Sequence, residues 1–370
     1  MRKKIGNILA AATVILQFDA CDESGIPSLD HELSDYPVVF TGGVGTDVSM
    51  TRSGLVNEFP ENAQVGMYMY CMAQNGQAGN SPWETKKLNS LPDSKFDNMP
   101  LTYTSGVWTY TPLAYWYEEA DYLYSFFAYY PYDAGVENNS GAGIRVQTEQ
   151  NGSPIGDPVL TYTLSFSDGT ESTKRDMNEV TDVLYSNKID HLNTGIPVDM
   201  TFYHLLTGLE FEVDNYNESA AVTITDLRLK GTFHRSVSLS LNKPITASGQ
   251  YSGYFSIIAS GHSQEFAANT SQQTVMTDGG SEPAELMLVA DYEDNTITGG
   301  RNGGCSIDIS YSINGNSYTR NNLAVPVDQM TFRPGVKNII SLEFLGNNLA
   351  LDFRAGDHWI IGGDDEIIFQ

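Results

Sequence analysis

The pattern that most constrains the fold lies near the middle of the chain, at residues 199–213. Apolar and polar residues alternate there, as a β-strand buried on one face requires. The alternation changes phase once: Met200, Phe202 and Leu206 share one parity, and Leu209, Phe211 and Val213 share the other. Side chains in a strand repeat every two residues, so a regular strand cannot absorb this change. We therefore predict a bulge or bend at Thr207-Gly208, at a seam between two β-domains.

His204 lies beside this predicted bend and allows two interpretations. It could be a metal ligand or a base, but no second histidine stands at ligand spacing. We therefore favour a histidine that forms a hydrogen bond near the bend.

The composition agrees with an all-β fold. A chain of 370 residues is long enough for two domains with a core each. It contains 21 Tyr, 16 Phe, 34 Gly and 15 Pro, a mixture typical of strands joined by many turns. The net charge of −26 repels phosphate backbones, so we do not expect nucleic acid as a partner.

The N-terminus reads as an export signal. Arg2, Lys3 and Lys4 precede an apolar run, and small Ala20 stands before Cys21. This arrangement is similar to a bacterial lipoprotein signal, in which the cysteine is acylated and becomes the mature N-terminus. The alternative is an ordinary secretory signal with an incidental cysteine. We predict a signal peptide at 1–20, lipidation of Cys21 and a polar tether at 21–37.

Residues 38–195 are predicted to form the first β-domain. Val65 to Cys71 alternate as a core strand, and Leu160 to Phe166 alternate as a half-buried strand. The stretch Tyr122–Tyr132 is too aromatic for a strand with one buried face. It is either buried on both faces or exposes an aromatic row on which sugars could stack.

Residues 196–370 are predicted to form the second β-domain with a strand-like tail. The clean alternation from Cys305 to Ile313 ends at Asn314-Gly315, which predicts a hairpin. A second hairpin is predicted around Gly346-Asn347-Asn348, and a bent strand near Asp226. Cys71 and Cys305 lie in different predicted domains, so we expect free thiols rather than a disulfide.

No catalytic motif is visible in the sequence. The six histidines are scattered, and acidic groups such as Asp291, Glu293 and Asp294 are typical of solvated loops in so acidic a chain. We predict a binding or structural protein rather than an enzyme, with no cofactor and no metal site.

Several local patterns together resemble the fimbrillin family, the Mfa-like and FimA-like pilins of Bacteroidales. Residues 199–213 resemble its F-x-H-x-L strand, and Thr51-Arg52 before Val65-Gly66 resembles its early Thr-Arg and I-G-V-Y strand. Further segments match in the same order: Phe127–Pro131, Asp182–Tyr185, and Phe332–Lys337 followed by Trp359.

The resemblance implies two tandem transthyretin-like β-sandwich domains, exported as a lipoprotein to the outer membrane surface. It also implies subunits that assemble into a fimbria by strand donation after a protease removes the N-terminal strand. A donated strand fills a gap in a partner's sheet by main-chain pairing. The expected partners are other fimbrial subunits, the outer membrane through a lipid, and surface glycans or proteins of host or bacterial cells.

Three functions are therefore weighed: a fimbrial subunit or adhesin, a non-polymerising glycan-binding lipoprotein, and a β-sandwich glycoside hydrolase. The third needs two convergent carboxylates that the sequence does not mark. For the first, Arg52 is the predicted processing site, because no other Lys or Arg lies between Lys4 and Lys86. It follows a predicted strand and lies in a polar break that a protease could reach.

The C-terminal tail is the candidate intersubunit strand. Trp359 and Ile361 share one face, as do Ile367 and Phe369, with Gly-Gly-Asp-Asp between them. The tail could extend into a neighbour's sheet or turn back as a hairpin that caps its own domain.

Overall fold

The structure of the protein is a computed structural model. It describes residues 33–42, 59–73, 82–117, 122–164, 174–176, 181–193, 195–234, 236–242, 255–259, 262–267, 274–275, 279–280, 284–288, 305–325 and 334–358. Regular structure in these ranges is almost entirely β-strand, which confirms the all-β prediction. The helical elements are α1 (Pro82–Lys86), η1 (Lys87–Asn89) and η2 (Ser94–Phe96). No helix within the described ranges is long and apolar enough to cross a membrane.

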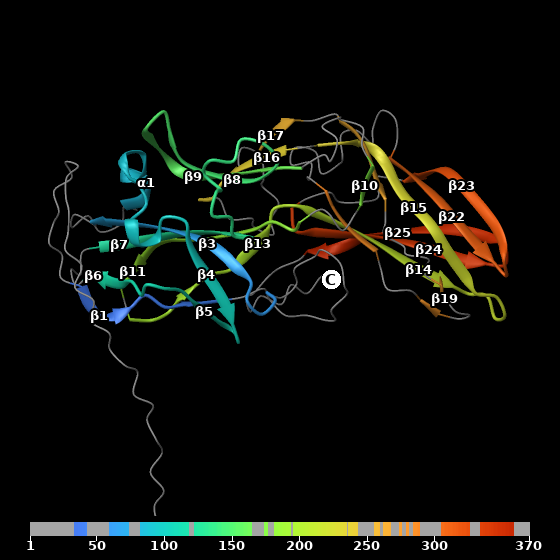
Figure 1. Cartoon of the computed structure of the whole chain (residues 1–370), viewed down its shortest axis with the longest axis horizontal. Helices are drawn as coiled ribbons and strands as arrows, with labels where there is room; N and C mark the ends of the chain where they lie inside the picture. The colour runs from blue at the N-terminus through green and yellow to red at the C-terminus, as the bar shows by residue number, and fades with distance from the viewer. Residues whose placement is uncertain are drawn as a thin grey trace, which may run out of the picture.

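The first half of the chain is organised around an eight-stranded sheet at one end of an elongated molecule (Figure 1). Its strands, in spatial order, are β12 (Val198–Asp199), β2 (Phe40–Thr41), β5 (Val107–Thr109), β4 (Met99–Thr104), β3 (Gln64–Ala73), β7 (Tyr122–Tyr130), β11 (Leu184–Leu192) and β13 (Phe202–His204). A separate two-stranded ribbon lies beside it and consists of β1 (Leu33–Pro37) and β6 (Tyr115–Tyr117).

The eight-stranded sheet curls toward closure. Its two outermost strands, β12 and β13, are joined by Met200-Thr201 alone, and β11 also contacts β12. The curled sheet encloses an aromatic core that includes Phe40, Phe126 and Trp116. This arrangement leaves few free edges, which are otherwise prone to unwanted pairing.

A four-stranded sheet covers the outer face of β3, β7 and β11. It consists of β17 (Phe255–Ala259), β16 (Ser236–Ser240), β9 (Ser153–Thr163) and β8 (Gly143–Gln150). Tyr68, Phe127 and Tyr129 from the large sheet belong to the same buried cluster as Leu160 and Val237 from the small one. Strands β3 and β7 are therefore buried on both faces.

The second half forms a sandwich of two sheets. One contains β10 (Lys174–Asp176), β18 (His262–Ala267), β15 (Val222–Phe233), β22 (Cys305–Ile313) and β23 (Asn316–Val325), with β19 (Thr274–Val275) also on β15. The other contains β20 (Gly279–Gly280), β14 (Thr207–Asn215), β24 (Val336–Leu345) and β25 (Asn348–His358), with β21 (Ala284–Leu288) also on β14. Tyr311 and Phe344 meet edge-on across the sandwich, with ring centroids 4.8 Å apart.

Both predicted hairpins are confirmed. Strands β22 and β23 meet at Asn314-Gly315, where both residues have positive φ (50° and 78°), as the favoured two-residue hairpin turn requires. Strands β24 and β25 meet at Gly346-Asn347. The predicted bend near Asp226 is also present, because the pairing of β15 with β22 shifts between Ile224 and Asp226.

The predicted break in residues 199–213 exists, but it lies earlier than expected. Strand β13 ends at His204 and β14 begins at Thr207, so Leu205-Leu206 form the bend. The two strands belong to different sheets. Phe202 packs in the core of the curled sheet, whereas Leu206 and Leu209 pack in the other buried cluster. Passage from one core to the other is the physical cause of the phase change.

Strand pairing crosses the predicted domain boundary at 195/196. Strand β12 pairs with β2, β13 with β11, and β16 with β9. The last five residues of the expected tether, Leu33–Pro37, form β1. The division into two tandem domains at this boundary stays a prediction. A division at 195/196 would separate strands that pair within the same sheet.

Candidate functional site

The segment Leu33–Gly42 completes the curled sheet from its N-terminal side. Strand β2 lies between two partners: it is antiparallel to β5 and parallel to β12. Backbone hydrogen bonds hold the segment from both sides: Val38 N to Ala114 O (2.9 Å), Val198 N to Val39 O (2.7 Å) and Met200 N to Thr41 O (3.0 Å). The segment is therefore an interior strand of the sheet.

Phe40 fixes the segment in the core. Its side chain is fully buried and meets Phe96, Phe126 and Tyr110 at centroid distances of 5.6, 5.2 and 6.1 Å. All three contacts are edge-on, the geometry that aromatic quadrupoles favour. Val38 is buried as well, whereas Val39 between them is exposed. The segment thus has the alternation of a strand with one buried face.

Two side chains clamp the backbone of the segment. Tyr110 donates its hydroxyl to Val38 O at 2.6 Å, and Trp108 Nε1 donates to Gly42 O at 2.9 Å. Burial raises the pKa of Tyr110 to about 12, so the hydroxyl keeps its proton and remains a donor. Gly42 has φ +105°, and a Cβ there would stand 2.3 Å from Met200 O. Only glycine fits this close approach.

Chemically, this arrangement can exchange one strand for another. Withdrawal of the segment would leave backbone groups of Ala114, Val198 and Met200 unpaired and would empty the Phe40 position. Buried polar groups without partners are costly, so an incoming strand that restores the pairing is favoured. We call this position, between β5 and β12, the slot.

The seam between the two cores carries a buried polar pair. His204 Nδ1 lies 3.1 Å and 2.9 Å from the two carboxylate oxygens of Asp182, and both side chains are almost completely buried. The prediction that His204 forms a hydrogen bond near the bend is confirmed. The pair joins the end of β13 to the residues before β11, so it fixes where the chain leaves the curled sheet.

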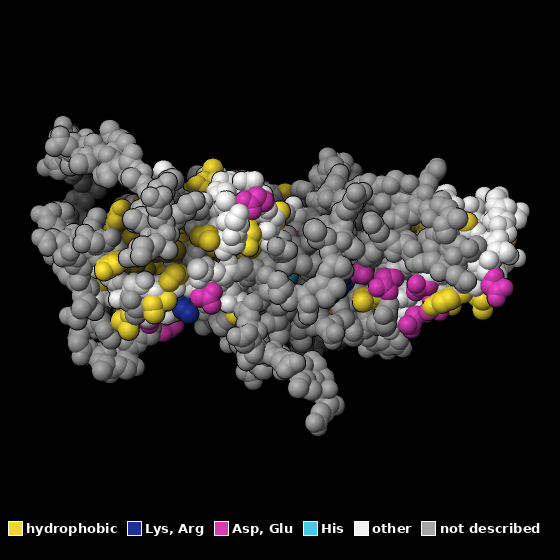
Figure 2. Space-filling view, turned by 90° about the horizontal axis from the view of Figure 1, so that it is seen from below, with side chains coloured by type: hydrophobic (Ala, Val, Ile, Leu, Met, Phe, Trp, Pro, Cys, Tyr) yellow, Lys and Arg dark blue, Asp and Glu magenta, His cyan; other side chains and the backbone are white. Residues whose placement is uncertain are grey.

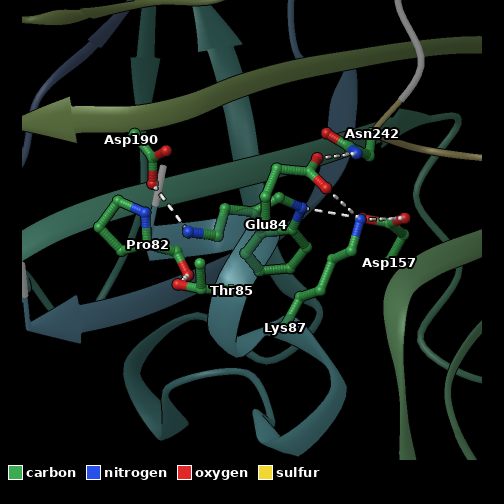
Figure 3. A network of polar contacts seen from close by, with 8 residues as sticks. Pro82, Glu84, Thr85, Lys87, Asp157, Asp190 and Asn242 are labelled. Atoms are coloured by element: carbon green, nitrogen blue, oxygen red, sulfur yellow. Dashed lines mark hydrogen bonds and ion pairs between the residues drawn. The ribbon is translucent and has the colours of Figure 1, made fainter. Parts of the chain in front are cut away.

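A second polar network fastens α1 to the sheets (Figure 3). Lys87 Nζ contacts Glu84 at 2.9 Å and Asp157 at 3.1 Å, and Trp83 Nε1 donates to Asp157 at 2.8 Å. Burial lowers the pKa of Lys87, but the hydrogen bonds and charges of Glu84 and Asp157 raise it overall. The network is a structural clasp. Sequence reasoning missed it, although Pro82 at the first position of a helix was an available signal.

Comparison with known proteins identifies the family. Residues 51–352 match the family described as fimbrillin-like. This match spans most of the chain. The chain belongs to the fimbrillin-like family. No curated protein matches it.

Solved structures place the fimbrillin-like chain among fimbrial folds. A fimbrial protein from Bacteroides vulgatus is 19% identical, covers 86% of this chain and 99% of its own, and has a TM-score of 0.56. A fimbrial assembly protein from Parabacteroides distasonis is 9% identical, with coverages of 88% and 97% and a TM-score of 0.35. The fimbrial anchor protein Mfa2 from Porphyromonas gingivalis is 11% identical, with coverages of 83% and 94% and a TM-score of 0.30. The first of these supports a shared fold.

The family is fimbrial, which agrees with a structural or adhesion protein at the cell surface and not with an enzyme. Within the described ranges, no three His, Cys, Asp or Glu side chains come together as a metal site would require. Cys71 and Cys305 are free thiols, and burial raises the pKa of Cys305 to about 12.

The site residues predicted from the sequence lie outside the part of the chain that the structure describes. They are Cys21, Arg52, Trp359, Ile361, Ile367 and Phe369. The resemblance implied that an N-terminal strand is removed, but Val38–Phe40 is too short to show a period, so the partners of this strand, and with them the slot, were not predicted.

Of the two arrangements considered for the aromatic stretch Tyr122–Tyr132, the structure shows the buried one. Tyr124, Phe126, Phe127 and Tyr129 of β7 have exposed fractions of 0–1%, so both faces of this strand belong to the core. An open pocket of about 590 Å³ lies nearby, at the ends of β7, β8 and β9. Its lining includes Tyr132, Tyr162, Thr163 and Thr181. This volume is within the range of small-molecule sites.

Proposed function

We propose that this fimbrillin-like protein is a fimbrial subunit that exchanges its own Leu33–Gly42 strand for a strand of another subunit. One observation carries the proposal: the segment is an interior strand whose partners among the described residues lie beyond Arg52. A single cleavage at Arg52 would therefore release the segment from the covalent chain without cutting the rest of the sheet. The family match begins at Thr51, so the segment precedes the matched region.

The C-terminal tail is the proposed donor. Its residues Ile367-Ile368-Phe369 repeat the pattern of Val38-Val39-Phe40, with two β-branched residues followed by phenylalanine. In this register Ile367 and Phe369 would take the two buried positions, and Ile368 the exposed one. Trp359 and Ile361 would belong to the connection between the two subunits. The competing arrangement is a hairpin of the tail on its own domain.

The precursor is proposed to be a lipoprotein of the outer membrane, anchored through Cys21. Eleven residues, 22–32, separate that cysteine from β1. A lipid there would hold the unprocessed subunit at the membrane through the same segment that the slot retains. Cleavage at Arg52 would then leave only non-covalent contacts between the subunit and its anchored segment, so displacement of the segment would both open the slot and free the subunit from the membrane.

The test uses purified unprocessed protein and an arginine-specific protease. We expect the wild type to form ladders that resist mild SDS after cleavage. Arg52→Ala should remain uncleaved at this site and monomeric, and deletion of 362–370 should be cleaved but form no ladders. Arg52→Lys, treated with a lysine-tolerant protease, is the matched control and should form ladders. Wild-type ladders without release of Leu33–Gly42 would refute the exchange.

A further inference from the structure

Exposed apolar side chains gather around the slot. Tyr36, Val39, Leu113 and Ile196 have exposed fractions of 65%, 37%, 56% and 64%. We call these four residues the slot-flanking patch. Figure 2 shows hydrophobic side chains gathered at the end of the molecule that carries the first half of the chain, with acidic side chains prominent at the other end.

Backbone hydrogen bonds bring three of the four residues, Val39, Leu113 and Ile196, onto neighbouring backbone segments. Val38 N bonds Ala114 O, which places Val39 beside Leu113. On the other side, Val39 O accepts from Val198 N, which places Ile196 close by. The patch thus lies on three neighbouring backbone segments. Single exposed apolar residues are ordinary on a protein surface, whereas a contiguous group marks an interaction site.

We propose that the slot-flanking patch is the surface on which the body of a second copy of this chain docks when that copy donates its strand. The inference rests on the proposed function and adds a second contact to it. It concerns Leu113 and Ile196 above all, because Tyr36 and Val39 leave with the cleaved segment. The outward side chain of the incoming strand, Ile368 in the register above, would replace Val39 between them.

Chain length argues for a second copy as the occupant. The last described residue of the second sandwich is His358, at the end of β25, and eight residues, 359–366, separate it from Ile367. An extended chain advances about 3.3 Å per residue, so the donor's body lies within about 26 Å of the slot. A donor held this close must cover surface next to the slot, and the patch is that surface.

Charge also explains why the contact is apolar. The full chain carries a net charge of −26, and residues 53–370, which remain after cleavage, hold 16 Lys and Arg against 39 Asp and Glu, or −23, so two bodies repel each other at close range. Burial of apolar surface does not depend on charge and can oppose this repulsion. Exposed leucine and isoleucine beside the slot are therefore suited to contact between two acidic copies.

The test compares two double variants of processed protein. Leu113→Ser/Ile196→Ser removes the part of the patch that remains after cleavage. Leu88→Ser/Leu345→Ser is the matched control, because those residues are 67% and 65% exposed but lie elsewhere on the chain. Two quantities are measured for each: the rate of ladder formation, and the replacement of the cleaved Leu33–Gly42 segment in the slot by a synthetic 362–370 peptide.

We expect ladder formation to be about tenfold slower in the patch variant and unchanged in the control, with equal peptide binding in both. Unchanged ladder formation in the patch variant would overturn the inference and leave the proposed function intact. If the patch variant lost both peptide binding and ladder formation, the inference would also be overturned, because the substitutions would then act through the slot.

Two further outcomes are decisive. If the wild type neither binds the peptide nor forms ladders, the proposed function fails and this inference fails with it. If the patch variant forms ladders normally but loses binding of the unprocessed protein to phosphatidylethanolamine/phosphatidylglycerol vesicles, the patch contacts membrane and not a second copy.

Discussion

The slot segment and the hairpin β24–β25 are both hydrogen-bonded β-structure with buried phenylalanines, yet they are held in opposite ways. Strand β24 reaches β25 through the two-residue turn Gly346-Asn347, so the pairing is local. The slot segment instead pairs with residues far along the chain, beside Trp108 and Val198. The hairpin therefore pairs strands that are adjacent in the sequence. The slot segment instead inserts between two strands, β5 and β12, that are distant from it in the sequence.

This difference determines which strand can be exchanged. A hairpin strand is covalently tied to its partner at the turn, so cutting the chain elsewhere does not release it. The slot segment precedes Arg52, and all the described contacts that hold it lie after Arg52. Its attachment beyond that point is entirely non-covalent. A strand held in this way can be replaced by another with equivalent pairing.

The largest expected effect is on the free energy of unfolding, when one of two buried phenylalanines, Phe40 or Phe344, is replaced. Phe40→Ala should destabilise the unprocessed protein by about 3–5 kcal/mol, because it empties a fully buried aromatic position. After strand exchange the same substitution should have no effect, since Phe40 has left with the segment. Urea unfolding followed by tryptophan fluorescence is a suitable measurement, because Trp108 and Trp116 lie in the core of the curled sheet.

Phe344→Ala is the matched control in the second sandwich. Phe344 is also fully buried, but it stays in the chain after cleavage at Arg52. Phe344→Ala should therefore destabilise the second sandwich equally before and after strand exchange. Amide hydrogen exchange of β24 measures this effect. Equal effects of Phe40→Ala in both states would contradict the proposed release of the segment.

The same contrast explains what the sequence could predict. The hairpins were predictable because Asn314-Gly315 and the flanking alternation lie in one short window. The slot was not, because three residues, Val38–Phe40, carry no information about distant partners. The bend in residues 199–213 was predicted from its phase change, but its position was wrong by about two residues. Alternation indicates which residues are buried but not in which core they lie. Leu206 was therefore grouped with Met200 and Phe202, although it packs in the other buried cluster.

An intermediate effect is expected at the turn of the hairpin β22–β23. Gly315 has φ +78°, where a side chain is strained, so Gly315→Ala should destabilise the hairpin by about 1 kcal/mol. The change should raise hydrogen exchange in β22 and β23 and leave ladder formation intact. Gly152→Ala, at another exposed turn with positive φ, is the control and should act on β8 and β9 alone. An effect of Gly315→Ala on strand exchange would show that the two halves are coupled.

The smallest expected effect is a pH dependence confined to the first half. Partial burial, and then the charges of Glu137 and Glu149, raise the pKa of Asp97 to about 6. A carboxyl group whose pKa is higher in the folded state than its unfolded value of about 4 binds its proton more tightly when folded. Its favourable contribution is therefore complete below about pH 4 and is lost as the pH rises through 6.

Asp97→Asn removes this titration and should make the curled sheet slightly more stable than wild type at pH 7, with no difference below about pH 4. Because Asp97 keeps contact with solvent, screening limits the gain to a few tenths of a kcal/mol. Asp352→Asn, on an exposed position of β25, is the control for removal of one charge. A gain that is the same at pH 4 and pH 7 would show that net charge, and not the neighbours of Asp97, is responsible. A gain that grows between those values and is absent from the control would place the pH response in the sheet that holds the slot.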